Sequence, residues 1–515
     1  MSKINIAERD LSWYYRQRGE GSMTVLVPGM SSFGPTDRPV LCDSSNFSRV
    51  YGGPVPNVVD LSYNMAASFI KAGFNVLFYR FVDPSATTAE AQDITGEGTS
   101  KLKISAKYPG SYGSGLSVKI KAGTSPNWYF FVYDKAGILL ENLVVNFADP
   151  TNKNYYSSID TEFINIKLDG EWKGFNAPAD AVKLSGGTDG SDAATIKSNT
   201  RAEIIKEGAF SDLLDPYQYT FDLISAADWC DHKDLDEDSR EKVDVVLGEL
   251  AYNRGTAEYF IDGDKDSNDP AEQYQYCGLF DSYKSHVTGV GPWGYAQLLS
   301  NGQTALLPGS YAMLVQWAQS CSEGVPAWMA PAGVKRASLG SFYRRPKYEI
   351  GKTTLDMWQN HDYVEPNGYK VIPIMKAKQY GYVVYGNSTL LKNSGDGSTS
   401  MLQSLSTRIL CNLIKNKAFD VSLSLQFDQM TDDLFSQFKT VLGTYMDTLR
   451  YGGALYDYEI VLDSTTVTRT DLNERTVPVI IRISPNPTAD NFDITLEISQ
   501  AGVTFTDDTD ENEVG

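Results

Sequence analysis

The pattern of apolar and polar positions becomes regular near residue 23. Residues 23–27 form a short apolar run closed by a Pro-Gly turn, which is typical of a strand. Residues 57–71 repeat apolar side chains at helical spacing, and Gly73 is placed to cap the end of that helix. Residues 74–82 are almost continuously apolar, as in a strand buried on both faces. The order strand, helix, strand predicts an α/β layer.

The pattern changes between residues 97 and 190, where short apolar segments alternate with glycine-rich turns. This alternation favours β-strands joined by tight loops. The strand candidates are residues 102–106, 116–120, 128–132 and 139–145. We therefore expect an all-β insertion. Beyond it the α/β pattern returns, with a helix at 243–251, a strand at 258–261 and a helix at 311–319.

The last third of the chain predicts two amphipathic helices followed by strands. The first helix has an apolar face and, on another side, a polar stripe of Arg408, Asn412 and Lys415. The second helix, residues 432–450, follows Thr431, which is a favourable N-cap. Strands are expected at 458–462, 479–483 and 494–498, and the end of the chain is acidic.

These patterns predict a multidomain protein of the α+β and α/β classes, with mixed sheets, helices, an all-β insertion and extended terminal arms. The expected parts are an N-terminal arm (1–22), an α/β middle domain (23–96 and 191–350), a β-rich insertion (97–190), a C-terminal domain (351–500) and a C-terminal arm with an acidic tail (501–515).

Composition and charge exclude several classes of protein. The chain has 515 residues, with 45 Lys and Arg against 65 Asp and Glu, and a formal net charge of −20. That charge argues against general nucleic-acid binding and against docking on anionic lipid. No apolar run approaches the roughly 20 residues of a membrane-spanning helix, and the first residues lack the apolar core of a secretion signal. The five cysteines are odd in number and form no CxxC, which indicates reduced thiols in a cytosol.

Candidate chemistry is sparse. Gly351-Lys352-Thr353 resembles the end of a phosphate-binding loop, but Pro346 stands where that loop needs a glycine. Residues 264–268 imitate the start of a calcium loop whose turning glycine and final glutamate are missing. The three histidines do not have the spacing of a zinc site; they are His232, His286 and His361. We therefore expect no catalytic residue, no cofactor and no metal site.

Several short motifs follow one another in a specific order. They are Val25-Leu26-Val27-Pro28-Gly29, Phe78-Tyr79-Arg80, the Gly-rich segment 184–190, the Ala-Pro-Ala-Gly turn at 330–333, and Gly452-Gly453-Ala454-Leu455-Tyr456-Asp457-Tyr458. In this order, across residues 23–500, they resemble the sheath proteins of contractile bacteriophage tails.

The resemblance implies a structural subunit that needs no cofactor. Such subunits stack as hexameric rings in a helical sleeve around an inner tail tube, and contraction of the sleeve drives the tube through a host envelope. The implied partners are further copies of the chain, the tube protein, and baseplate and tail terminator proteins, with no direct nucleic-acid contact and no membrane insertion. The implied location is the tail sheath of a virion assembled in the host cytoplasm.

Two surfaces are candidates for contacts between subunits. The terminal arms are hypothesised to add strands to a neighbour's sheet through Ile4 and Ile6 and through Val503 and Phe505. The alternative is that both ends are merely frayed.

The helix at residues 406–419 is the candidate tube-facing surface. Its site residues are Arg408, Asn412, Lys415 and Lys417, which make it locally basic in an acidic chain. The alternative for this helix is an ordinary solvated face. The β insertion is expected to be outermost. Two other functions stay open, namely a non-contractile surface-lattice or fibre protein and, with less support, a hydrolase built from scattered carboxylates.

Overall fold

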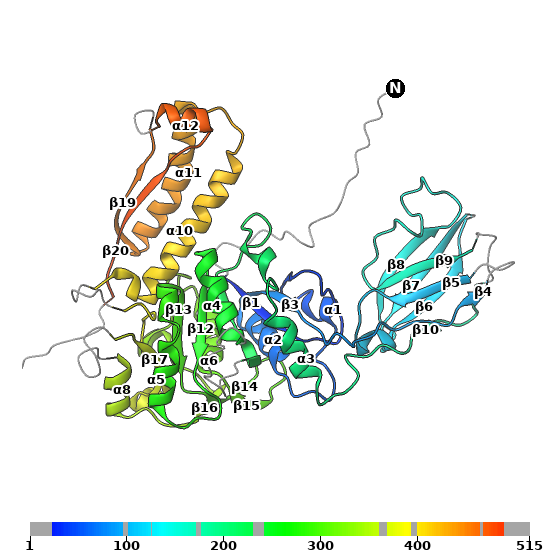
Figure 1. The fold of residues 1–515 in the computed structure, drawn as a ribbon, viewed down its shortest axis with the longest axis horizontal. Coiled ribbons are helices and arrows are strands. Elements are labelled where there is room, and N and C mark those ends of the chain that lie inside the picture. Colours follow the sequence, from blue (N-terminus) through cyan, green and yellow to red (C-terminus); the bar gives the residue numbers. More distant parts are fainter. Residues whose placement is uncertain are drawn as a thin grey trace, which may run out of the picture.

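The computed structural model describes residues 23–95, 101–124, 126–170, 177–229, 242–359, 368–392, 399–463 and 467–488. Figure 1 shows a central α/β body, a β-rich part at one end of it, and a helical hairpin that projects from it. The expected arms at 1–22 and 501–515 lie outside the described residues, and so does the strand expected at 494–498.

An eight-stranded sheet forms the centre of the body, in the order β18-β17-β13-β12-β11-β1-β3-β2. The strands from β17 to β3 run parallel to their neighbours, whereas the two edge strands are antiparallel. Their bounds are β1 Thr24–Gly29, β2 Val40–Cys42, β3 Asn75–Arg80, β11 Leu223–Ser225, β12 Glu258–Asp262, β13 Val287–Gly291, β17 Val371–Lys376 and β18 Tyr382–Val384.

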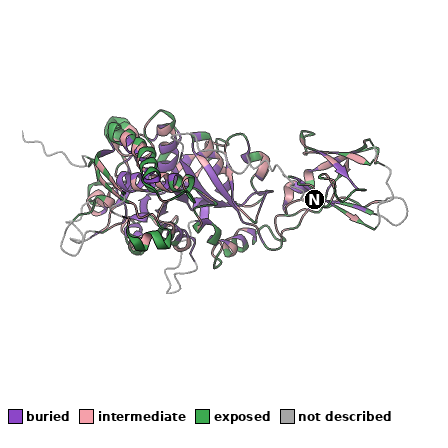
Figure 2. Cartoon of the chain, turned by 90° about the horizontal axis from the view of Figure 1, so that it is seen from above, coloured by how far each residue is buried: buried purple, intermediate pink, exposed green. Residues whose placement is uncertain are grey.

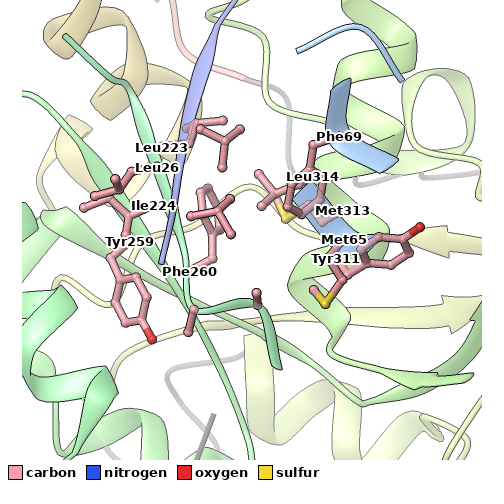
Figure 3. Packing of buried hydrophobic residues seen from close by; sticks show 14 of the residues in the cluster. Leu26, Met65, Phe69, Leu223, Ile224, Tyr259, Phe260, Tyr311, Met313 and Leu314 are labelled. Carbon is pink, nitrogen blue, oxygen red and sulfur yellow. The ribbon is translucent and has the colours of Figure 1, made fainter. Parts of the chain in front are cut away.

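Helices cover both faces of this sheet, which explains why its strands are apolar along their whole length. Successive residues of a strand point to opposite faces, as Figure 3 shows for Tyr259 and Phe260 of β12. The Tyr259 hydroxyl donates a hydrogen bond to Asp244 of one helix, whereas the Phe260 ring lies 6.3 Å from the Trp317 ring of another. These helices are α4 (Val243–Arg254) and α6 (Gly309–Ser322), and α2 (Ser62–Ala72) packs beside α6.

Smaller elements complete the body. A three-stranded antiparallel sheet consists of β14 Gly294–Gln297, β15 Thr304–Leu307 and β16 Tyr343–Pro346. The remaining α-helices here are α1 Phe47–Tyr51, α3 Ile196–Ile204, α5 Pro270–Gly278, α7 Gly333–Arg336 and α8 Lys352–Gln359. Short 3₁₀ helices in the body and its connections are Ser211–Leu214, Ala227–Trp229, Asp281–His286, Lys378–Tyr380 and Met401–Gln403.

The central sheet extends past residue 350, where the sequence pattern predicted the start of a C-terminal domain. Strands β17 and β18 belong to the central sheet, with β17 paired in parallel to β13. A short apolar run predicts a strand but does not say which sheet the strand joins.

The β-rich part has two sheets and its own core. The sheets have the strand orders β10-β6-β7-β8 and β4-β5-β9. Figure 2 shows this part extending away from the central body. Its elements are β4 Ile94–Thr95, β5 Lys101–Ala106, a 3₁₀ helix Ser111–Gly115, β6 Ser117–Ala122, β7 Asn127–Tyr133, β8 Leu139–Asn146, β9 Ile164–Asp169 and β10 Val182–Lys183. Its buried residues form a hydrophobic cluster separate from that of the body.

The projecting unit consists of a helical hairpin covered by a two-stranded antiparallel sheet (Figure 1). The hairpin is α10 (Leu405–Ser424) and α11 (Asp432–Tyr451), and Thr431 caps α11 by accepting a hydrogen bond from the Leu434 amide. The sheet is β19 (Leu455–Val461) with β20 (Ile480–Pro485), and α12 (Arg469–Glu474) lies between these strands in the chain. This unit has a third hydrophobic cluster.

Candidate interaction surfaces

Helix α10 joins the projecting unit to the central body. Its first turns belong to the central core, through Leu405 and Ile409. Leu410 and Ile414 belong instead to the core that α10 shares with α11. The helix therefore crosses from one core to the other, and its remaining polar face meets the central sheet.

Two of the four residues predicted to face a partner are buried under this contact. Arg408 is 4% exposed and Asn412 is 0% exposed. The expectation that both lie at the surface is corrected by this burial. The periodicity shows that the polar residues share a face, but that face is covered by the body and not by solvent. Only Lys415 and Lys417 retain exposed or partly exposed side chains.

The polar face of α10 meets polar residues at the amino ends of the parallel strands. Parallel strands begin at one edge of their sheet, so residues that precede or start β11, β12 and β13 gather there. Asn416 Nδ2 donates to Asp222 Oδ1 at 3.3 Å, and Arg408 Nη1 donates to Ser285 Oγ at 3.4 Å. Sequence reasoning missed these partners because nothing in a single strand reveals its neighbours in the sheet.

Burial changes the ionisation of two groups in this contact. Burial raises the pKa of Glu258 to about 8, and the hydrogen bond from Thr288 and the charge of Arg408 oppose that rise. Burial lowers the pKa of His286 to about 4, and Arg408 and Lys415 act in the same direction. At neutral pH both groups are therefore mainly uncharged, and Arg408 is the cation of the contact.

The exposed part of α10 lies beside a groove. Lys415 Nζ donates to the Gly255 carbonyl at 3.0 Å, and Lys417 lies over the Tyr445 ring at 5.9 Å from its centre. Lys417 also lines a groove whose walls come from three parts of the molecule, among them Leu41 of the edge strand β2 and Glu162 of the β-rich part. This groove leaves part of the hairpin surface accessible beside the body.

The two-stranded sheet of the projecting unit is open at its edges. Among the described residues, β19 and β20 pair only with each other. Tyr456 is 78% exposed and Ile480 is 53% exposed, so apolar side chains accompany the free backbone groups. An exposed edge of this kind can accept a further strand. The arm residues predicted to supply one, Ile4, Ile6, Val503 and Phe505, lie outside the described residues.

A buried arginine seats the β-rich part on the body. Arg80, at the end of β3, donates to the carbonyls of Ser31 at 3.0 Å, Gly34 at 2.8 Å and Pro109 at 2.8 Å. Phe33 of the body belongs to the core of the β-rich part. At Gly110, where φ is +134°, a Cβ would lie 2.1 Å from the Ser32 carbonyl oxygen, so this close approach requires glycine.

The weak ligand motifs have local structural roles. Lys352 begins α8, and Asp269 caps α5 by accepting a hydrogen bond from the Ala271 amide at 2.9 Å. Within the described part of the chain, no three His, Cys, Asp or Glu side chains gather as metal ligands. In the same residues, no helix is long and apolar enough to cross a membrane. His232 and His361 lie outside the described residues.

Comparison with known proteins identifies the class of fold. No protein-family model matches the chain. The tail sheath protein of Vibrio phage KVP40 is 23% identical over 214 residues, which cover 41% of this chain and 29% of the phage protein. The chain thus matches less than a third of the length of that curated relative.

Solved structures match over almost the whole chain. The sheath tail protein Lin1278 from Listeria innocua has a TM-score of 0.58 at 14% identity, covering 91% of this chain and 93% of its own. A chain of the anti-feeding prophage baseplate in its contracted state has a TM-score of 0.53 at 11% identity, covering 96% and 97%. The mixed α/β fold is therefore that of tail sheath proteins. The resemblance to contractile-tail sheath proteins that the sequence motifs indicated is confirmed.

Proposed function

We propose that this chain is the structural subunit of a contractile tail sheath. The observation that carries the proposal is the match to the Listeria sheath tail protein, which spans 91% of this chain and 93% of that one. A match of this extent includes the central body, the β-rich part and the projecting unit together. The likeness to a contractile assembly in its contracted state supports contraction as the activity.

This role implies how the subunits assemble, how the sheath contracts and which partners it has. Subunits stack as hexameric rings around an inner tail tube, and contraction from the baseplate drives the tube through a host envelope. The energy is held in subunit packing, so the subunit itself catalyses no reaction and binds no cofactor. The further partners are the tube, baseplate and terminator proteins, and the place of action is a virion tail assembled in the host cytoplasm.

Strand exchange is the proposed link between subunits. The open edges of β19 and β20 are the acceptor surface, and the terminal segments 1–22 and 501–515 of neighbouring copies supply the added strands. Main-chain hydrogen bonds across such an edge tolerate rotation of one subunit against another, because the linking strand can bend between its two ends. The β-rich part extends away from the body (Figure 2), which supports an outermost position for it.

The proposed contact with the tube is now limited to Lys415 and Lys417. We expect the double change Lys415→Glu and Lys417→Glu to slow tube-templated assembly by roughly tenfold, because complementary charges accelerate association. Arg408 is unsuitable for this test because it is buried. Assembly on purified tubes, followed by light scattering at low and high salt, measures the effect.

The matched control reverses two exposed lysines of the β-rich part, Lys121→Glu and Lys167→Glu. This control changes net charge equally and should assemble at the wild-type rate. Equal slowing by both pairs would show an effect of total charge and contradict a local tube contact.

Electron microscopy of the purified protein tests the proposed function directly. We expect hollow, transversely striated tubes, in the wide form when no inner tube is present. Flat or unstriated lattices would indicate a non-contractile surface protein instead. Turnover of a polymer substrate that a single carboxylate change abolishes would indicate a hydrolase.

A further inference from the structure

The four-stranded sheet of the β-rich part carries a row of aromatic side chains on its outward face. Strand β7 directs Phe130 and Val132 into the core, where both are 0% exposed, and the second sheet contributes to that core. Successive strand residues point to opposite faces, so Tyr129, Phe131 and Tyr133 share the outward one. Tyr129 is 36% exposed, and the other two rings are partly exposed. The rings therefore recur about every 7 Å along one strand.

Lysines flank this row of rings. They are Lys119 and Lys121 of β6 and Lys183 of β10, and together with the three rings they form what we name the aromatic–lysine face. Lys119 aligns with Phe131, Lys121 aligns with Tyr129, and Lys183 aligns with the outward Ser117. Lys121 Nζ lies 5.4 Å from the centre of the Phe131 ring, so both side chains are on this face. None of the three lysines forms an ion pair with another described residue.

The aromatic–lysine face has no carboxylate that neutralises its lysines. The one acidic residue in the four strands is Glu141, and its carboxylate accepts hydrogen bonds from two backbone amides at 2.9 and 3.2 Å. Lysines of the other sheet differ, because Lys101 pairs with Asp93 and Lys103 pairs with Asp169. Salt screens charges beyond about 8 Å, so a ligand at this face meets local positive charge although the chain carries −20 in total.

The combination fits a polymer of acidic sugars. Aromatic rings offer flat apolar surfaces on which the C–H faces of sugar rings can stack, and lysine ammonium groups bind carboxylate, sulfate or phosphate. Asn142 of β8 aligns with Phe131 and is exposed, so its amide can exchange hydrogen bonds with sugar hydroxyls.

We propose that the aromatic–lysine face binds an acidic polysaccharide of a cell surface. Stacked rings on a four-stranded sheet also suit single-stranded nucleic acid. The polysaccharide is favoured because the β-rich part extends away from the body (Figure 2) and is outermost in the proposed sheath, where it meets cell surfaces. The choice of polymer therefore rests on the proposed function.

Binding of the full chain to defined polymers tests the proposal. The probes are polygalacturonic acid and dextran sulfate, with neutral dextran as the uncharged counterpart and poly(dT) as the nucleic acid, and affinity electrophoresis measures retention. We expect retention by an acidic polysaccharide and little by dextran. Tyr129→Thr with Phe131→Thr should weaken binding at least about tenfold, because the stacking surface of two rings is lost. Threonine suits a strand, so the sheet is preserved.

Two lysine pairs separate a built face from general attraction between charges. Lys119→Gln with Lys121→Gln should weaken binding at least about tenfold and reduce its dependence on salt. Lys101→Gln with Lys103→Gln is the matched control, because it removes the same charge from the other sheet and should bind like the wild type. Thermal melting checks that each variant is folded.

Each outcome decides for or against the aromatic–lysine face. Wild-type protein that prefers neither acidic polysaccharide to dextran overturns the proposal, and so does equal weakening by both lysine pairs with no effect of the ring variant. Tighter binding of poly(dT) than of either polysaccharide would assign the face to nucleic acid instead.

Tube formation is measured separately by electron microscopy. A folded ring variant that binds no polysaccharide and still forms tubes supports the proposal. If that variant forms no tubes, the face is a contact between subunits, and the polysaccharide proposal fails while the sheath function stands. Wild-type protein that forms no tubes contradicts the sheath function, whereas the binding of monomers to the polymers still decides the proposal.

Discussion

Removal of residues 1–20, or of residues 501–515, should leave folded monomers that no longer polymerise into tubes. Among the described residues, the three hydrophobic clusters consist of residues between 23 and 483, and both truncations leave all of these in place. Each added strand would contribute several main-chain hydrogen bonds of about 0.5–1.5 kcal/mol each, and losing them weakens every link in the lattice. Size-exclusion chromatography and negative-stain microscopy measure assembly, and thermal melting checks the fold.

The matched control removes a larger segment that is not a proposed link. Thr87 and Thr188 exchange backbone hydrogen bonds at 3.0 and 3.1 Å, so the intervening residues can be replaced by a short turn. Phe33→Ser should accompany the excision, because removal of the β-rich part takes away the core that covers Phe33 and would leave its ring exposed. This variant is expected to polymerise. Normal tubes from both arm truncations would refute strand exchange. The same conclusion would follow if, of the three variants, only the excised one failed to form tubes.

Elements with a one-sided apolar pattern could be predicted from the sequence. The second helix was expected at residues 432–450 and is Asp432–Tyr451, with Thr431 as its cap. Leu434, Phe438 and Leu449 of its apolar stripe are buried at helical spacing, so local sequence suffices for the helix, although Val441, expected in the same stripe, is 49% exposed. Strands β1 and β3 were predicted for the same kind of reason, since continuous apolar runs indicate burial on both faces.

Elements that depend on distant neighbours could not be predicted from the sequence. Strand β13, Val-Thr-Gly-Val-Gly, has two glycines and no apolar alternation, and it is a strand because β12 and β17 flank it. Strand β17 contains Pro373, which argues locally against a central strand. Sheet order is a property of the whole chain, so the membership of β17 and β18 in the central sheet could not be predicted from local pattern.

The polar stripe of α10 was likewise predictable from the sequence only in part. The stripe of Arg408, Asn412 and Lys415 was recognised, but Arg408 and Asn412 are buried, and the partner of Arg408, Ser285, lies far away in the sequence. A polar face on a helix is usually solvated, and it is buried here because the strand ends supply polar partners such as Asp222 and Ser285.

Arg80 is the residue whose loss should cost the isolated subunit most. Its side chain is 1% exposed and holds three carbonyl groups, two from the body and that of Pro109 from the β-rich part. Burial lowers the pKa of Arg80 to about 10, which still leaves it charged at neutral pH. Hydrogen bonds from a charged donor are stronger than neutral ones, and no other side chain at this junction spans both parts with three of them among the described residues.

Arg80→Met keeps an unbranched apolar stem but leaves three carbonyl groups without their donor. At about 1–2 kcal/mol for each, we expect a loss of about 3–6 kcal/mol in the free energy of unfolding. Urea unfolding followed by fluorescence measures this loss, and limited proteolysis should show earlier cleavage near residues 84–88 and 186–190. Arg482→Met is the control, because Arg482 is 64% exposed in a surface ion pair with Glu459 and should cost less than about 1 kcal/mol. If Arg80→Met unfolds within 1 kcal/mol of the wild type with an unchanged cleavage pattern, the β-rich part is seated by the Phe33 cluster and not by the arginine.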